Sequence, residues 1–226
     1  MSREAFLDRV RRAAQAGQAH RVQLHPLPPD VGYVGVEGDL CERFAAEIEA
    51  IGGVVHAVDD RNLARSVLDS LVAAGGASRA LCWQHELLVR LGLDELLAAR
   101  GIQRLDYAAL AALPPAQRRE VMLACQIGIT SCDWAIAETG SLVMCSGAGR
   151  ERVASLLPPM HVAVVERKQI VPDLVDAIGA LSRGGHQRLP SNVVLISGPS
   201  KTGDIELQLT TGVHGPGTWH VIVIKQ

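Results

Sequence analysis

Several features that define other protein classes are scarce in this sequence of 226 residues. No apolar run approaches the ~18–20 residues of a membrane-spanning helix, and the first residues lack the apolar core of a signal peptide. Acidic and basic side chains nearly balance, with a formal net charge of −2 and a pI near 6.4, whereas nucleic-acid-binding domains usually show a basic excess. We therefore expect a soluble, cytoplasmic protein that has no membrane span and binds no nucleic acid.

Cysteines are also few, and they lie too far apart for a metal or cluster motif. The five are Cys41, Cys82, Cys125, Cys132 and Cys145. No two have the spacing of roughly two to four residues that zinc and iron–sulfur sites commonly use. An odd number in a chain without an export signal favours reduced thiols. We expect no metal and no cofactor in this chain.

The sequence is rich in apolar residues, at 48% hydrophobic, which is enough to bury a full core. From residue 39 onward, predicted helices alternate with short apolar strands, beginning with the helix 39–50, the strand 54–58, the helix 62–74 and the strand 79–83. This alternation predicts an α/β fold with a mostly parallel sheet flanked by helices.

The chain is expected to divide near residue 38. Residues 1–38 are predicted to form an N-terminal helix, at about 4–16, and an irregular arm rich in proline and glycine. The arm could pack on the main body or serve in a dimer, and the sequence does not decide between these, so a homo-oligomer stays possible. Residues 39–226 are predicted to form a single α/β domain.

The first candidate site is a turn between two predicted strands, at Glu138, Thr139, Gly140 and Ser141. Glu138 is compatible with a general base, with a nucleophile toward an activated acyl group, or with an acceptor that braces the turn. Thr139 and Ser141 are candidate donors to a carboxylate or phosphate. Gly140 is expected to supply a positive φ.

A glycine-rich segment at 146–150 follows, and it leads into a predicted helix over 151–157. Backbone N–H groups at a helix N-terminus can bind an anion. Gly147 and Arg150 are therefore candidate anion-binding residues.

The second candidate site follows the predicted strand 193–196, and ligands of open α/β sheets bind outside the carboxyl ends of strands. Its candidate anion-binding residues are Gly198, Ser200, Lys201 and Thr202. The spacing lacks the two glycines of a Walker A loop. An alternative interpretation is a surface turn with the lysine in solvent.

Two carboxylates and a histidine complete this second site. Asp204 and Glu206 would share one face of a strand and could pair with Lys201 or Arg150. His214, followed by Gly215, is either an acid–base group or a histidine that is simply hydrogen-bonded in a turn. We predict that Glu138, Ser200, Lys201 and His214 converge on one cleft at the carboxyl ends of the sheet.

The order of these motifs, Ala-Glu-Thr-Gly-Ser, then Gly-Pro-Ser-Lys-Thr with Asp-Ile-Glu, then Gly-Val-His-Gly-Pro, resembles the lactate utilization protein C (LUD domain) family. The resemblance extends over about residues 128–224. It implies the fold of the sugar-phosphate isomerase and CoA-transferase-like group.

The resemblance also implies a function, namely that of a soluble subunit of an L-lactate oxidation system that converts lactate to pyruvate. The iron–sulfur clusters would lie in partner subunits. Two alternatives stay open: a stand-alone enzyme acting on an acyl-CoA or a phosphorylated sugar through Glu138, and a non-catalytic scaffold that binds a small carboxylate. Whether the chain has activity alone is not decided by its residues.

Overall fold

The computed structural model describes residues 2–18, 36, 38–183, 190–205 and 208–226, and for residues 18, 203–205, 208 and 209 the backbone only. The chain splits into two compact units, residues 1–34 and residues 35–226. In the first unit the described element is helix α1 (Arg3–Gln18). All further elements belong to the second unit.

The centre of the second unit is a six-stranded sheet in which every pairing is parallel. Its strands are β1 (Val54–Val58), β2 (Arg79–Cys82), β3 (Gln103–Leu105), β4 (Ile127–Thr130), β7 (Met160–Glu166) and β12 (Thr218–Ile224). They lie in the order β1-β12-β7-β4-β2-β3. The last strand of the chain is thus inserted between the first strand and β7.

Helices flank this sheet, which confirms the predicted α/β class. They are α2 (Leu40–Ala50), α3 (Arg61–Ala74), α4 (Glu86–Arg90), α5 (Leu93–Ala99), α6 (Tyr107–Ala111), α7 (Pro115–Leu123), α8 (Val153–Leu156) and α9 (Leu174–Arg183), with a short 3₁₀ helix η1 (Arg167–Gln169). Helix α3 shows why they pack: Ala64, Leu68 and Val72 recur at i, i+4 and i+8 and are buried, while Asp60 caps its first turn.

A second, four-stranded sheet was not expected from the sequence. It consists of β8 (Ile170–Val171), β5 (Trp134–Ile136), β6 (Ser141–Cys145) and β9 (Val193–Ile196), in that order. Strand β6 is antiparallel to both β5 and β9. The carboxyl end of β9 therefore does not lie at the carboxyl edge of a parallel sheet, and the rule used to place the second motif does not apply to it.

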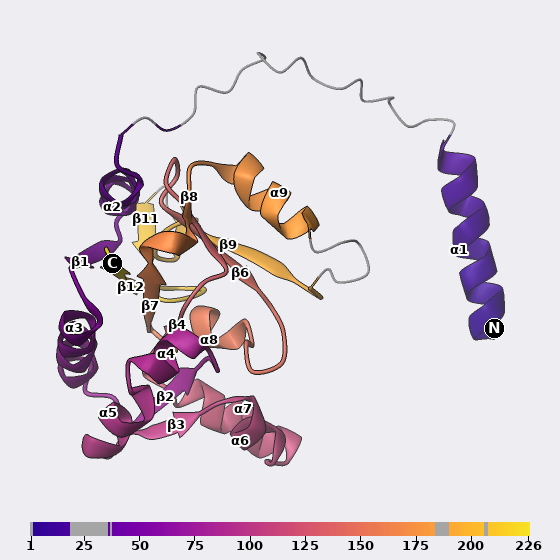
Figure 1. Cartoon of the computed structure of the whole chain (residues 1–226). Coiled ribbons are helices and arrows are strands. Elements are labelled where there is room, and N and C mark those ends of the chain that lie inside the picture. Colours follow the sequence, from indigo (N-terminus) through magenta and orange to yellow (C-terminus); the bar gives the residue numbers. More distant parts are fainter. Residues whose placement is uncertain (1, 19–35, 37, 184–189, 206–207) are drawn as a thin grey trace. The chain divides into compact units, whose positions relative to one another are not determined.

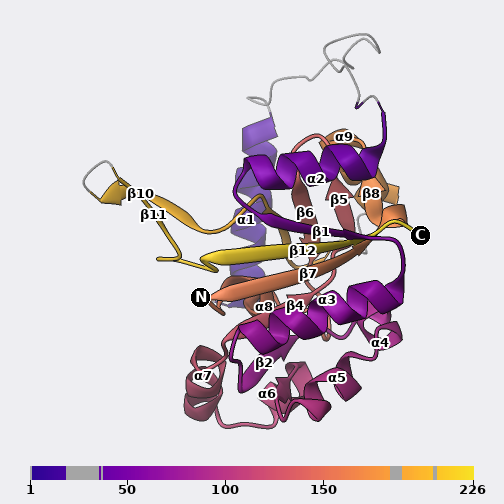
Figure 2. The same ribbon diagram turned by 90° about the vertical axis from the view of Figure 1, so that its left-hand side faces the viewer.

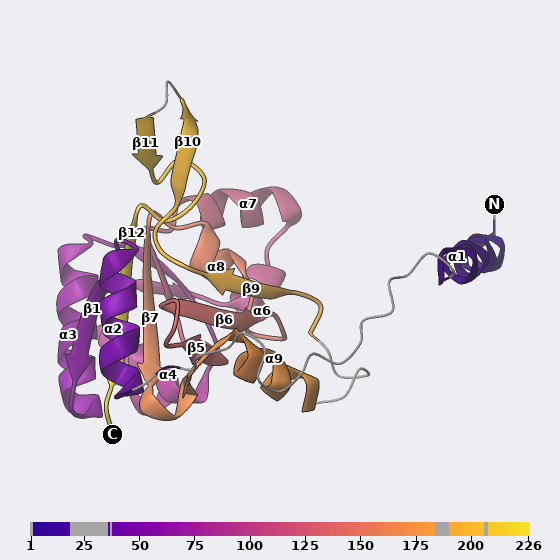
Figure 3. The same ribbon diagram turned by 90° about the horizontal axis from the view of Figure 1, so that it is seen from above.

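The two sheets form layers, with α3 on one face of the six-stranded sheet and the four-stranded sheet on the other (Figures 1 and 3). Helix α2 packs on β1 and on β8 and so contacts both sheets. Figure 2 shows α2 and α3 on opposite sides of the strands β1, β12 and β7. The strand expected at Asp204 is part of a hairpin, formed by β10 (Lys201–Ile205) and β11 (Gln208–Thr211).

Local departures from the predicted helices have identifiable causes. Helices α4 and α5 are separate because Gly92, between them, adopts a φ of 63°. Arg65 of α3 donates to the carbonyl of Gly92 at 2.6 Å and also to that of Leu91, which holds the break against α3. The helix expected over 151–157 is the short α8, Val153–Leu156.

All five cysteines are buried and unbridged. Burial raises the pKa of Cys82 to about 12 and those of Cys125 and Cys145 to about 11, so these thiols stay protonated at neutral pH. Among the described helices, none has the length and apolar content needed to cross a bilayer.

Candidate functional site

The predicted Glu138 turn joins β5 to β6 and is held by its backbone. Glu138 donates its backbone N–H to the carbonyl of Pro172 at 3.0 Å, while its side chain is exposed. Gly140 adopts the predicted positive φ, at 63°, and a Cβ there would lie 2.7 Å from the backbone nitrogen of Ile48 in α2. The turn is therefore packed directly against α2.

The hydroxyl groups of this turn bond one another. Thr139 Oγ1 donates to Ser141 Oγ at 2.8 Å, and Ser141 Oγ lies 2.6 Å from Ser197 Oγ at the end of β9. Ser141 is buried. These contacts engage the hydroxyls that were candidate anion donors, and they brace the turn. The role of the Glu138 side chain stays a prediction.

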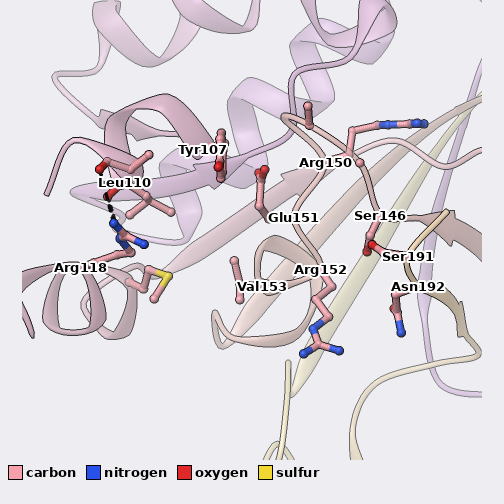
Figure 4. Close-up of a pocket in the computed structure, with 14 residues that line it drawn as sticks. Tyr107, Leu110, Arg118, Ser146, Arg150, Glu151, Arg152, Val153, Ser191 and Asn192 are labelled. Carbon is pink, nitrogen blue, oxygen red and sulfur yellow. Dashed lines mark hydrogen bonds between the residues drawn. The ribbon is translucent and has the colours of Figure 1, made fainter. Parts of the chain in front are cut away.

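Gly147 and Arg150 line a cavity of about 790 Å³ (Figure 4). Arg118, on the opposite wall, donates to the carbonyls of Leu110, Ala111 and Leu113, and so caps the end of α6. Arg150 instead pairs with Asp133, Nη1 to Oδ1 at 2.7 Å.

The glycine-rich turn itself offers little to an anion. Gly147 and Arg150 exchange backbone hydrogen bonds of 3.4 and 3.0 Å, and Gly149 donates its N–H to Glu151 Oε1 at 3.1 Å. Since α8 is only four residues long, its dipole adds little. The expected anion cradle at this turn is thus occupied by bonds within the protein.

The second motif folds together with the His214 loop. Ser200 donates its N–H to the carbonyl of Pro216, and Gly212 donates to the carbonyl of Ser200, both at 2.9 Å. The segments 198–202 and 212–216, separate in sequence, are therefore bonded to each other.

Lys201 has a structural partner. Its Nζ donates to the carbonyl of Ile51 at 2.7 Å, and Ile51 is the C-cap of α2. A cation at a helix C-terminus interacts favourably with the helix dipole. Gly198, with a φ of 109°, packs against the same carbonyl: a Cβ there would lie 3.1 Å from it.

These segments wall a cavity of about 240 Å³, which we call the motif cavity. Four predicted residues line it: Gly198, Ser200, His214 and Gly215. Its other walls include Ser155 and Leu156 of α8, Ser197 after β9, His161 of β7 and Trp219 of β12. His161 and Trp219 were not expected to contribute, because inside apolar strands such residues are ordinarily core side chains.

His161 and Trp219 are register partners on adjacent parallel strands. Both are buried, at 0% and 2% exposed. Thr130 Oγ1 lies 2.8 Å from His161 Nε2, whereas His161 Nδ1 and Trp219 Nε1 have no hydrogen-bond partner in the described part of the chain. Burial lowers the pKa of His161 to about 3, so the ring is neutral at physiological pH.

The motif cavity lies at the amino ends of β7 and β12, since His161 and Trp219 are the second residues of these strands. The prediction of a single cleft at the carboxyl ends is therefore wrong. Ser200 and His214 do meet in the cavity, while Glu138 and Lys201 do not line it. The Glu138 turn and the segment that follows β9 are instead connected by the hydrogen bond between Ser141 and Ser197.

The remaining predicted residues lie beside this cavity or outside the description. Thr202 pairs with Thr210 in the β10–β11 hairpin. Glu206 and the side chain of Asp204 lie outside the described residues, so their pairing with Lys201 or Arg150 stays a prediction.

At the carboxyl edge of the six-stranded sheet lies a group of charges that sequence reasoning missed. Glu166, whose side chain is 4% exposed, is bonded by Arg61 at 3.0 Å, Arg90 at 3.2 Å and Lys168 at 2.6 Å. Burial alone would raise the pKa of Glu166, but the bonds from Lys168 and Arg61 and the charge of Arg90 lower it. This network ties α3, α4 and the end of β7 together. The sequence feature that could have indicated this group of charges is the acidic residue Glu166 at the end of an apolar strand.

Fold and motif cavity together define an α/β domain in which a parallel sheet is backed by a smaller mixed sheet. A family model described as "LUD domain" matches residues 41–224. The chain belongs to the LUD domain family, as the motif order indicated.

Sequence identity to individual relatives agrees with this family assignment. The chain is 31% identical over 227 residues to lactate utilization protein C of Anoxybacillus flavithermus, covering 98% of each chain. It is 31% identical over 160 residues to lactate utilization protein C of Halalkalibacterium halodurans, covering 70% of this chain and 67% of the relative.

A crystal structure of a DUF162 family protein from Deinococcus radiodurans has the same fold. The TM-score is 0.57, with 21% sequence identity over 82% of this chain and 96% of that one. At this identity the likeness establishes the fold alone.

Proposed function

We propose that this chain is a cytoplasmic subunit of an L-lactate oxidation system, which converts lactate to pyruvate together with iron–sulfur partner subunits. The observation that carries the proposal is the similarity to lactate utilization protein C along 98% of the chain. Oxidation of lactate to pyruvate releases two electrons and two protons. The clusters that accept the electrons are assigned to the partners, because the cysteine spacing of this chain matches no cluster motif.

In this proposal His214 accepts a proton from the substrate. It is exposed, lines the motif cavity and follows Val213 in a loop bonded to Ser200. Histidine is the side chain most often used for proton transfer near neutral pH. Glu138 is the weaker candidate for this role because it lies outside the cavity.

Growth on L-lactate tests the role of the chain. A strain lacking the gene should fail on L-lactate, grow normally on pyruvate, and recover with a plasmid copy. Normal growth of the deletion strain on L-lactate would refute the proposal.

Affinity purification from lactate-grown cells tests the partners and separates subunit from solitary enzyme. The tagged chain should co-purify with proteins that carry iron and absorb visible light. Recovery of the chain alone, with turnover of an acyl-CoA or a sugar phosphate, would favour the stand-alone enzyme. Cell fractionation reads out the cytoplasmic location.

A further inference from the structure

Two buried ring nitrogens without hydrogen-bond partners belong to residues that line one small cavity. A buried N–H that lacks an acceptor costs about 1–3 kcal/mol, so native proteins satisfy nearly all of them. In the described part of the chain, His161 Nδ1 and Trp219 Nε1 are both unsatisfied, and both residues line the motif cavity. Their adjacency on paired strands makes this one site with two polar groups.

The hydrogen-bond inventory indicates that the site offers donors. Indole Nε1–H can only donate. Within this inference Thr130 donates its hydroxyl to His161 Nε2, which leaves Nδ1 to carry the ring proton. Trp219 and His161 therefore carry two N–H groups without acceptors, and a ligand that bonds to them must supply the acceptors.

Trp83 is a buried tryptophan of the same fold whose indole N–H does have an acceptor. It is 1% exposed, as deeply buried as Trp219, and its Nε1 donates to the carbonyl of Glu151 at 3.0 Å. Burial of an indole in this fold therefore does not by itself remove its acceptor, and the missing acceptor is particular to Trp219.

Size and lining narrow the class of ligand. The cavity, about 240 Å³, is smaller than the ~300–1,000 Å³ sites of drug-sized ligands. Leu156, Ile196 and Pro216 supply an apolar wall, and Ser200 adds a hydroxyl. A ligand that fits has oxygen acceptors at one end and a short apolar group at the other.

We propose that the motif cavity binds a small monocarboxylate whose oxygens accept hydrogen bonds from Trp219 Nε1 and His161 Nδ1. The choice of L-lactate and pyruvate as ligands rests on the proposed function. His161 and Trp219 are thereby binding residues, and Ser200 and His214 line the same cavity. Helix α8 covers it through Ser155 and Leu156.

Nuclear magnetic resonance tests this without any substitution in the cavity. The chain has three tryptophans, so its ¹H–¹⁵N spectrum contains three indole peaks, which Trp83→Phe and Trp134→Phe assign by elimination. Saturating L-lactate or pyruvate should shift the Trp219 peak downfield, as its N–H gains an acceptor, and leave the Trp83 peak in place. An unmoved Trp219 peak at saturation would mean that the cavity holds only water and would overturn the proposal.

Calorimetry with matched variants measures the contribution of the indole N–H. Trp219→Phe should weaken L-lactate at least tenfold, whereas Trp83→Phe should leave the affinity within threefold. Thermal melts control for folding, and Trp83→Phe should lower Tm more, because it breaks an existing hydrogen bond. Equal affinity of wild type and Trp219→Phe would contradict the proposal.

The neutral amide lactamide tests the carboxylate. It should bind at least tenfold more weakly than L-lactate, and equal binding would overturn the assignment to a carboxylate.

Failure of the binding inference is distinguishable from failure of the proposed function. A deletion strain that cannot use lactate, with a pure protein that binds neither acid, would sink the inference alone. Tight binding with normal growth of the deletion strain would sink only the role in lactate oxidation.

Discussion

The hydroxyl oxygens of Ser141 and Ser197 lie 2.6 Å apart and join the two motifs of the sequence. Ser141 begins β6 and Ser197 follows β9, one step beyond the last register pair of these antiparallel strands, Leu142 with Ile196. The same Ser141 hydroxyl accepts from Thr139. The motifs are therefore neighbours because two strands of the smaller sheet pair, although the sequence suggested a shared edge of the larger one.

Ser141→Ala should lower the free energy of unfolding by about 0.5–1.5 kcal/mol, the usual net value of a hydrogen bond. Its two partners are exposed and can turn to water, which keeps the cost at this level. Urea denaturation measures it. Ser66→Ala is the matched control: it also removes one hydroxyl bond, to Asn62 O, but within an exposed face of α3, where alanine favours the helix. An equal loss in both variants would contradict the bracing role of Ser141.

Glu138→Gln should support normal growth on L-lactate, because Glu138 is exposed and its fixed contact is a backbone bond. His214→Gln, in the same complementation assay, should slow growth at least tenfold if the loop histidine transfers the substrate proton. Loss of growth in Glu138→Gln, with the protein still folded, would restore the catalytic interpretation of the turn.

Lys201→Ala should lower stability by roughly 0.5–1 kcal/mol, since it removes an exposed cap of α2. The affinity for L-lactate should stay within twofold, because Lys201 does not line the motif cavity. Thermal melts and calorimetry measure the two effects. Lys225→Ala serves as the control, for it removes another exposed lysine paired at 3.8 Å with Asp59. A large loss of lactate affinity in Lys201→Ala would return this lysine to the binding site.

Acidification should destabilise the protein from about pH 6.5 downward. The native pKa of His161 is lowered by burial to about 3, while in the unfolded chain it is near 6.5. Between these values the unfolded state binds a proton that the native state does not, so stability falls with decreasing pH by about 1.4 kcal/mol per unit for one such group. Burial lowers the pKa of His56, His85 and His220 as well, in the same direction.

Urea titrations across this window measure the slope. The free energy of unfolding of His161→Gln, which has no titrating ring at this position, should depend less steeply on pH than that of wild type. The difference in slope should be at most about 1.4 kcal/mol per pH unit, the contribution of one group. An unchanged slope would mean that His161 is already charged or solvated in the native protein.

Gly128→Ala should destabilise the protein by about 3 kcal/mol or more, at the upper end for overpacking. A Cβ at Gly128, in β4, would lie only 1.7 Å from the carbonyl oxygen of Ala154 in α8. Helix α8 would have to move, and with it the Ser155 wall of the motif cavity. Gly179→Ala, in helix α9, is the control. It should be neutral or stabilising, because the nearest atom to a Cβ there would be Arg183 Nη1 at 3.8 Å. Melts and lactate affinity together report both effects, and a native-like melt for Gly128→Ala would contradict this packing.

The parallel sheet could be predicted because its strands are short apolar runs between amphipathic helices, as β1 and α3 illustrate. The smaller sheet could not. Its strand β8 is two residues long, and β5 is three, lengths at which a periodic pattern cannot be recognised. Strand β9 then looked like one more parallel strand.

Motif chemistry predicted Ser200 and His214 as neighbours, and the structure brings both into one cavity. The donors His161 and Trp219 could not be predicted, since each stands in an apolar strand and looks like core. Their role depends on register between β7 and β12, which are separated by about a quarter of the chain. Such register is set by tertiary packing and leaves no local signal.

The insertion of β12 between β1 and β7 has a consequence for biosynthesis. Translation produces β12 after the other five strands of this sheet, yet both of its neighbours need it as a hydrogen-bonding partner. Until residues 218–224 have left the ribosome, a nascent chain exposes two unpaired apolar strand edges, which are templates for aggregation. The sheet can close only after residues 218–224 have been synthesised, so termination before Thr218 should yield an insoluble product that depends on chaperones.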